Sequence, residues 1–260
     1  MDILNRIETM QKDHEPSQLS DDIEIFQNNH IYMIMNRSAR SIYSTRVVYA
    51  HEDESYNADM IFKEAKDFFK YKKYSWYVTL PRDEVIYNML LTKGWQVHDT
   101  YEGRYLPLKE KKSYDHMQII EVEADSIEAD LLGNVVAEVW GVKDQKRVIE
   151  AKNKYNEYLK APDRRGGYVL AYHDGIAVGY ATYRLSDCSE YLYLSGTGVI
   201  ESYRKKGVYK NLLNYRLNKG FELKASYAIA QARKGHSSPI LEKYGFSKMG
   251  EFKHLIMDFK

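Results

Sequence analysis

The chain has 260 residues, of which 44% are hydrophobic and 29% are charged, a composition typical of soluble globular proteins. With 38 Lys and Arg against 37 Asp and Glu, the net charge of +1 argues against a dedicated nucleic-acid binder. The single cysteine excludes an intramolecular disulfide and a cysteine-based zinc cluster, and no apolar run reaches the ~18 residues of a membrane span. We therefore expect a cytoplasmic protein of one large or two modest domains, without a nucleic-acid or membrane partner.

The first block of the chain is predicted to mix strands and helices. β-branched and aromatic runs indicate strands, and apolar residues at helical spacing indicate helices. The charged run at 109–113 predicts a solvated connector, so we expect one domain over 1–112 and a second over 113–260. The expected elements are strands at 42–50, 74–79 and 102–108 and helices at 57–71 and 83–91.

The second block predicts a mixed α/β sandwich with several antiparallel pairs and one strand-helix-strand crossover. An Asp-Gly pair at 174–175, between two apolar runs, indicates a tight hairpin turn. The expected elements are strands at 117–122, 168–172, 176–185, 191–199 and 227–230, a final strand or hairpin at 246–259, and helices around 127–139, 145–159, 204–223 and 238–244.

The polar turn after the strand at 191–199 is the most informative stretch, with a helix beginning near Gly207. The first-turn amides of a helix have no intrahelical acceptors, and the helix dipole adds positive charge, so a phosphate can bind there. Gly207 removes a side chain where an anion would approach, and Arg204, Lys205 and Lys206 add full charges. A dinucleotide fingerprint fails at Glu201, and the order of residues does not fit a P-loop.

The segments 197–199 and 203–208 resemble the acetyl-CoA signature of the GNAT superfamily of N-acetyltransferases, which is Arg/Gln-x-x-Gly-x-Gly/Ala after a strand. Segment 237–246 is similar to the family's late helix, which closes with Gly-Phe, and the resemblance covers about 117–260. The first block resembles the same fold without the cofactor turn. The resemblance thus implies two tandem GNAT-like copies, of which the N-terminal one is degenerate; the alternative is an unrelated α/β extension.

The resemblance implies transfer of an acetyl group from acetyl-CoA, as co-substrate, to a primary amine of a small molecule or peptide by direct attack on the thioester. It implies polarisation of the thioester carbonyl by main chain near Val199. It implies contact of Ser237 or Ser238 with the pantetheine arm, although either serine could simply cap the helix. No metal is implied. The implied cofactor-binding residues are Val199, Arg204, Lys205, Lys206, Gly207, Val208, Tyr209 and Ser237.

The sequence departs from the family pattern at the positions that matter for proton transfer. Tyr209 stands where the family has a small residue, and Leu241 stands where a tyrosine often protonates the leaving thiolate. The family's carboxylate base falls near Tyr193, our candidate catalytic residue, for which lining of the cleft and packing in the sheet are both open. A water chain to Glu190 or Glu201 is a further option.

The sequence is also compatible with two hypotheses in which the protein is not an enzyme. One is a non-catalytic acyl-CoA-binding or regulatory module, and the other is a structural pair of domains without a cofactor. A homodimer is left open. His51 is followed by three acidic residues with no second histidine at ligand spacing, so we expect a solvated acidic loop there rather than a metal site.

Overall fold

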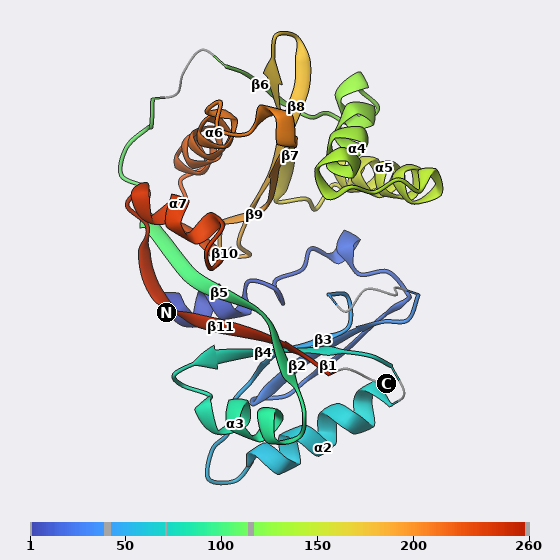
Figure 1. The fold of residues 1–260 in the computed structure, drawn as a ribbon, viewed down its shortest axis with the longest axis vertical. Helices are drawn as coiled ribbons and strands as arrows, with labels where there is room; N and C mark the ends of the chain where they lie inside the picture. Colours follow the sequence, from blue (N-terminus) through green and yellow to red (C-terminus); the bar gives the residue numbers. More distant parts are fainter. Residues whose placement is uncertain (1, 39–42, 71, 114–116, 258–260) are drawn as a thin grey trace. The chain divides into compact units, whose positions relative to one another are not determined.

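The computed structural model describes residues 2–38, 43–70, 72–113 and 117–257, and the chain forms two compact units that are interleaved along the sequence (Figure 1). Unit 1 comprises Met1–His14, Leu19–Leu106 and Ala230–Lys260, and unit 2 comprises Glu15–Gln18 and Pro107–Ile229. The expected domains over 1–112 and 113–260 describe two tandem copies of one fold that follow each other in the sequence, and this division stays a prediction. The units are defined by contacts, and by that measure the C-terminal segment belongs with the first block.

Unit 1 is built on a mixed sheet in which the strand order is β1-β2-β3-β4-β11-β5. Neighbouring strands are antiparallel except for β3 and β4, which are parallel. The last strand of the chain, β11, pairs with β4 on one side and β5 on the other, which explains why the C-terminal segment joins this unit. The elements are α1 (Ile3–Thr9), β1 (Ile23–Gln27), β2 (Ile31–Asn36), β3 (Arg46–Ala50), α2 (Ala58–Phe69), β4 (Ser75–Leu80), α3 (Glu84–Thr92), β5 (Gln96–Pro107), α7 (Ser237–Lys243) and β11 (Ser247–Ile256).

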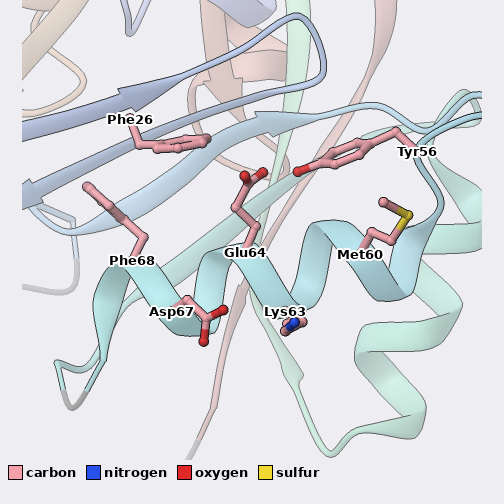
Figure 2. A pocket seen from close by; sticks show the side chains of 7 residues that line it. All are labelled: Phe26, Tyr56, Met60, Lys63, Glu64, Asp67 and Phe68. Carbon is pink, nitrogen blue, oxygen red and sulfur yellow. The ribbon is translucent and has the colours of Figure 1, made fainter.

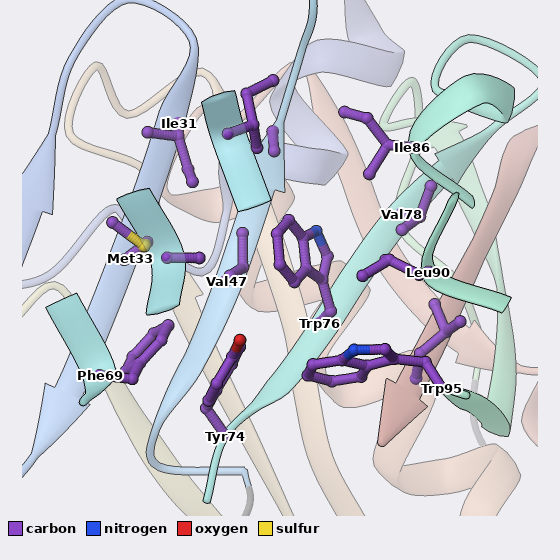
Figure 3. Close-up of a cluster of buried hydrophobic side chains, with 14 of the residues drawn as sticks. Ile31, Met33, Val47, Phe69, Tyr74, Trp76, Val78, Ile86, Leu90 and Trp95 are labelled. Atoms are coloured by element: carbon purple, nitrogen blue, oxygen red, sulfur yellow. The ribbon is translucent and has the colours of Figure 1, made fainter. Parts of the chain in front are cut away.

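Aromatic side chains fill the core of unit 1 between the sheet and helices α2 and α3 (Figure 3). The rings of Trp76 and Trp95 meet edge to face at 5.9 Å between centroids, and Phe69 stacks on Tyr74 at 4.2 Å. Each fully buried side chain of this size contributes about 1.5–3 kcal/mol through the hydrophobic effect. This packing explains much of the aromatic content of the first block.

Unit 2 has the strand order β10-β9-β8-β7-β6, with α6 on one face of the sheet and α4 and α5 on the other (Figure 1). All neighbouring strands are antiparallel except β9 and β10, which are parallel. The elements are two short 3-10 turns, η1 (Pro16–Gln18) and η2 (Glu201–Tyr203), with β6 (Gln118–Glu121), α4 (Ile127–Trp140), α5 (Gln145–Lys160), β7 (Gly166–His173), β8 (Ile176–Leu185), β9 (Tyr191–Val199), α6 (Val208–Glu222) and β10 (Tyr227–Arg233), whose last residues lie in unit 1.

Most predicted elements are confirmed, and the differences have local causes. The predicted helix at 204–223 begins too early, because Lys205 and Gly207 have φ of 65° and 80°, outside the helical region, and α6 starts only at Val208. Strand β5 begins at Gln96, six residues before the predicted 102. The sequence assigned nothing before 42, where the structure has α1, β1 and β2. Positions 42, 71 and 259, at the ends of three predicted elements, lie outside the described residues.

Helix α6 lies directly on the sheet because β8 has a glycine beneath its first turn. A Cβ placed on Gly179 would lie 2.9 Å from Cγ1 of Val208 and 3.4 Å from Cδ1 of Leu212. Close approach at this point fixes the start of α6 against β8, next to the end of β9.

We predict that Gly179→Ala destabilises unit 2 by about 1–3 kcal/mol, because the added methyl group overpacks the contact with Val208. The measurement is the free energy of unfolding in urea. The control is Ile176→Ala in the same strand, where the side chain is 55% exposed and the change should stay within about 0.5 kcal/mol. Equal stability of the two variants would contradict the tight packing of α6 on β8.

Candidate functional site

The sheet of unit 2 opens where β9 leaves β10. Their parallel register runs from Tyr191↔Tyr227 to Tyr193↔Ile229, so in unit 2 the rest of β9 is paired with β8 alone. The β8–β9 register shifts between Ala181 and Thr182, which puts a bulge at Gly196. A bulge bends and twists a strand and redirects its polar groups. The second half of β9 therefore presents one edge of its main chain next to the start of α6.

The first turn of α6 has the geometry of an anion site. Gly207 is the N-cap residue, with φ of 80° and ψ of −4°, and no side chain of the described residues caps the helix. The amide N–H groups of the first turn have no acceptor within the helix. A Cβ on Gly207 would meet only Nδ2 of Asn211, at 3.7 Å. The left-handed backbone conformation favours glycine here, and the open space beside its Cα is compatible with the approach of an anion, which stays a prediction.

The three basic side chains before Gly207 differ in their surroundings. Arg204 turns back and donates from Nε to the carbonyl of Val199 at 3.3 Å, while its Nη1 lies 3.9 Å from the exposed carboxylate of Glu201. The ammonium of Lys206 lies 4.8 Å from the ring centroid of Tyr203. Lys205 is exposed, and within the described part of the chain no ion pair engages it. The turn therefore keeps a positive charge that is accessible to solvent.

Tyr209, which replaces a small residue of the family pattern, is directed along α6. Its hydroxyl interacts with the guanidinium of Arg216, which is 1% exposed and donates from Nη1 to the carbonyls of Thr182 at 3.1 Å and Ser195 at 3.4 Å. Burial lowers the pKa of Arg216 to about 10, and the interaction with Tyr209 limits the fall. The ring of Tyr209 therefore extends toward the sheet and away from the first-turn amides.

Tyr193 lies in the core of unit 2. It is 1% exposed, and the guanidinium of Arg184 lies 5.1 Å from its ring centroid. Arg184 in turn pairs with the buried carboxylate of Glu15 at 3.5 Å. Such burial is what we expect if Tyr193 packs in the sheet and does not line the cleft. A catalytic role for Tyr193 stays a prediction. Of the two carboxylates considered with it, Glu201 adjoins the turn, whereas Glu190 precedes the far end of β9.

A polar pocket of about 340 Å³ adjoins the turn, lined by Lys206 and Asn211 together with residues of β6 and the β7–β8 hairpin. Asn211 is 1% exposed, and its Nδ2 donates to the carbonyl of Gly207 at 3.1 Å. Its buried Oδ1 has no hydrogen-bond partner among the described residues. Such an atom is costly to leave unsatisfied, but because it is closed to solvent it is not itself a contact for a ligand in this pocket.

Ser237 and Leu241, the late-helix residues singled out from the sequence, belong to unit 1. The hydroxyl of Ser237 accepts from the main-chain N–H of Arg233 at 2.9 Å, and Leu241 is buried. The neighbouring Ser238 is also buried and hydrogen-bonds Glu102, holding the pKa of that carboxyl at about 2 together with Arg104 and Lys248 against the opposing effect of burial. Cofactor binding by Ser237 stays a prediction.

Unit 1 contains a second parallel crossover, β3–α2–β4, whose turn has the opposite charge. The β3–β4 register covers only Arg46↔Ser75 and Val47↔Trp76 before the strands diverge. The turn before α2 carries Glu52, Asp53 and Glu54, all exposed. The side chain of Asn57 caps α2 by accepting from the N–H of Met60 at 3.0 Å. Because the helix start is capped and acidic, it disfavours a phosphate.

Near the same turn lies a buried ion cluster that the sequence did not predict. Ligand atoms of Glu8, His51 and Asp83 lie within 4.8 Å of one another, a spacing that could hold a metal. However, Nε2 of His51 lies 3.1 Å from Glu8, Nδ1 lies 3.0 Å from Asp83, and Arg82 pairs with both carboxylates. These contacts already balance the charges, so the group fits a metal poorly. Burial alone would lower the pKa of His51, but hydrogen bonds to Asp83 and Glu8 raise it to about 9.

Comparison with known proteins identifies the fold. The chain is similar to a GCN5-related N-acetyltransferase from Kribbella flavida, with a TM-score of 0.68 and 13% identity over 92% of this chain and 91% of the other. It is similar to a functionally unknown conserved protein from Staphylococcus epidermidis, with a TM-score of 0.67 and 16% identity over 93% of this chain and 98% of the other. It is also similar to a tandem GNAT protein from the clavulanic acid biosynthesis pathway, with a TM-score of 0.60 and 12% identity over 91% of this chain and 83% of the other. The predicted GNAT-like α/β fold is thus confirmed.

The family resemblance is also confirmed at the level of sequence. Residues 132–246 match the acetyltransferase (GNAT) family, and this segment, which contains the turn at Gly207, is a domain of that family. No curated protein sequence matched the chain. In the part of the chain that the structure describes, none of the helices has the length and apolar character needed to cross a bilayer.

The His51 cluster predicts a pH dependence of stability. The folded-state pKa of about 9 lies above the ordinary value of 6.5, so the cluster stabilises unit 1 in full below about pH 6.5 and loses this contribution as pH rises through 9. We expect a loss of about 1–2 kcal/mol over this range, since solvent partly screens the group. The measurement is urea unfolding against pH. His51→Gln should flatten the curve between these limits, and parallel curves for the two proteins would refute the assignment.

Proposed function

We propose that this protein is an acetyl-CoA-dependent N-acetyltransferase that transfers the acetyl group to a primary amine of a small molecule or peptide. The observation that carries the proposal is the uncapped N-terminus of α6, preceded by Arg204, Lys205 and Lys206 and placed at the open end of β9. An anion is stabilised at such a helix start by free amides, by the helix dipole and by neighbouring positive charges. A pyrophosphate with an adenosine attached is a ligand of this kind.

The residues fit this ligand in distinct ways. At Gly207 no described side chain caps the amides of the first turn, and the side chain of Tyr209 interacts with the buried Arg216. Lys205 and Lys206 supply mobile charge. Arg204, bound to the carbonyl of Val199, fixes the path of the chain between β9 and the turn. When bound, acetyl-CoA supplies the activated acyl group, and the main-chain edge of β9 is suited to hold its pantetheine arm.

In the reaction, the amine nitrogen forms a bond to the thioester carbon and the carbon–sulfur bond breaks. The incoming ammonium must lose one proton, and the leaving thiolate gains one. Glu201 is the carboxylate nearest the turn, and its side chain is 91% exposed, so we assign it the transfer of the amine proton to water. Tyr193, the candidate from the sequence, is buried beneath Arg184, and a catalytic role for it stays a prediction.

The second candidate is a module that binds acyl-CoA without turnover. It is favoured by Leu241, a buried apolar residue where the resemblance implies a proton-donating tyrosine, and by the burial of Tyr193. Calorimetry separates the two candidates, because a module of this kind binds CoA while releasing no thiol from acetyl-CoA in the presence of amines. We further propose a cytosolic location, since the single cysteine suits a reducing compartment.

We predict that the purified protein releases free thiol from acetyl-CoA in the presence of a panel of primary amines, and that Gly207→Val abolishes both release and binding. A valine at φ of 80° is strained by about 1–3 kcal/mol, so the turn must change its conformation. Gly94→Val is the matched control, because Gly94 has φ of 88° and nothing within 4 Å of an added Cβ, but lies in unit 1. Loss of CoA binding in the control as well would remove the turn from the proposal.

Charge at the turn gives an independent prediction. The double variant Lys205→Gln/Lys206→Gln should weaken acetyl-CoA binding by about tenfold at low salt, and the difference from the unmodified protein should shrink as salt is added. Calorimetry at two ionic strengths measures both effects. A deficit that is independent of salt would mean that these lysines act through the fold and not through their charge.

A further inference from the structure

Unit 1 contains a pocket of about 480 Å³ between β1 and α2 that neither the resemblance nor the proposed function explains. Three rings line it, those of Phe26 on β1, Tyr56 before α2 and Phe68 near the end of α2 (Figure 2). Phe26 and Phe68 lie 6.0 Å apart between centroids with their planes inclined at 52°. Aromatic faces attract cations as well as apolar groups.

A carboxylate lies at the centre of this pocket. Figure 2 shows the side chain of Glu64 rising from α2 between the rings of Phe26 and Tyr56. Its Oε2 accepts a hydrogen bond from Nδ2 of Asn28 at 3.3 Å, and no cation pairs with it within the described residues. Burial raises the pKa of Glu64, and the hydrogen bond from Asn28 and the charge of nearby His30 offset this effect only in part.

The hydroxyl of Tyr56 completes the polar part of the pocket. It points toward Glu64 in Figure 2, and this buried oxygen has no hydrogen-bond partner among the described residues. The ring is held in place, because His30 contacts it at 4.7 Å between centroids with the planes tilted by 34°, and Asp53 accepts from the main-chain N–H of Tyr56 at 3.0 Å. The hydroxyl is closed to solvent in this conformation, so a donor that contacts both oxygens requires a small opening between Glu64 and Tyr56.

The charged residues around the pocket favour a positively charged ligand. Its lining contains the carboxylates Glu64 and Asp67 against the single ammonium of Lys63, and the exposed acidic residues of the turn before α2 lie next to Tyr56 in the sequence. A phosphate or carboxylate ligand would be repelled by this field. An ammonium group would gain a charge-assisted hydrogen bond to Glu64 and contact with the aromatic faces.

We propose that unit 1 binds an organic ammonium ion in this pocket: a protonated amine attached to an apolar body, with the nitrogen between Glu64 and Tyr56 and the body between Phe26 and Phe68. The site is separate from the acyl-donor turn of unit 2 and does not depend on the proposed acetyl transfer. Its volume exceeds that of a small alkylamine and admits an arylalkylamine or the basic side chain of a peptide.

Phenethylamine and phenethyl alcohol provide the test, since they have the same shape and differ in charge at neutral pH. Calorimetry with the full chain should detect phenethylamine and give at least about tenfold weaker binding for the alcohol and for phenylacetate. No heat of binding for phenethylamine at millimolar concentration, or equal affinity for the alcohol, would overturn the proposal.

Variants locate the binding. Glu64→Gln keeps the shape and an acceptor for Asn28, and it should weaken phenethylamine binding at least about tenfold, whereas Tyr56→Phe should weaken it several-fold. Asp59→Asn is the matched control, because Asp59 lies on the same helix, is exposed and does not line the pocket. The midpoint of thermal unfolding of each of the three variants should lie within a few degrees of that of the unmodified protein.

The acceptor site of the proposed acetyltransferase could also bind an amine, so one further variant separates the two sites. Gly207→Val, which alters only the turn of unit 2, should leave the affinity for phenethylamine unchanged while acetyl-CoA binding is lost. Binding that survives Glu64→Gln but disappears in Gly207→Val would overturn the pocket of unit 1 and assign the amine to unit 2. The failure of one proposal is thereby distinguishable from the failure of the other.

Discussion

The buried guanidinium of Arg216 is the interaction on which the candidate acyl-donor site depends. No described carboxylate pairs with it; it is satisfied by the carbonyls of Leu212, Thr182 and Ser195 and by the hydroxyl of Tyr209. These contacts tie α6 to β8 and to the bulge of β9. The contact with Arg216 also directs Tyr209, which stands where the family pattern has a small residue, away from the start of α6. Since a buried charge is costly without such partners, the position of α6 relative to the bulge is strongly constrained.

Local signals in the sequence predicted the parts of the fold that local geometry decides. The Asp174-Gly175 hairpin turn has both residues at positive φ, as the Asp-Gly pair implied. Ser126 caps α4 and Gly141 ends it in the left-handed conformation, so the predicted helix has nearly its expected length. The start of a helix near Gly207 was predicted because glycine, basic residues and a preceding strand occur within one short segment. In each case the information lies within a few residues.

What the sequence could not predict depends on contacts between distant residues. Glu8, His51 and Asp83 come from three separate segments, and only the folded sheet of unit 1 brings them within 4.8 Å. Alternation along β9 left the environment of Tyr193 open, because both faces of the strand are covered over 191–194 and a residue on either face is buried there. The insertion of β11 between β4 and β5 is likewise a long-range pairing, which no pattern within 246–259 indicates.

The two units place opposite charges at the same point of the same crossover. In each unit a strand pairs briefly with a parallel partner, leaves it and leads through a turn into a helix. In unit 2 the helix start is uncapped and follows three basic residues, whereas in unit 1 Asn57 caps it after three acidic residues. The dipole of α2, like that of any helix, favours an anion at its N-terminus. In unit 1 the acidic turn repels such an anion and the Asn57 cap occupies an amide that would bind it. The same turn leads into the pocket that has Glu64 at its centre. The reversal of charge therefore favours an anionic ligand at the turn of unit 2 and a cationic ligand in unit 1, in line with the two proposals.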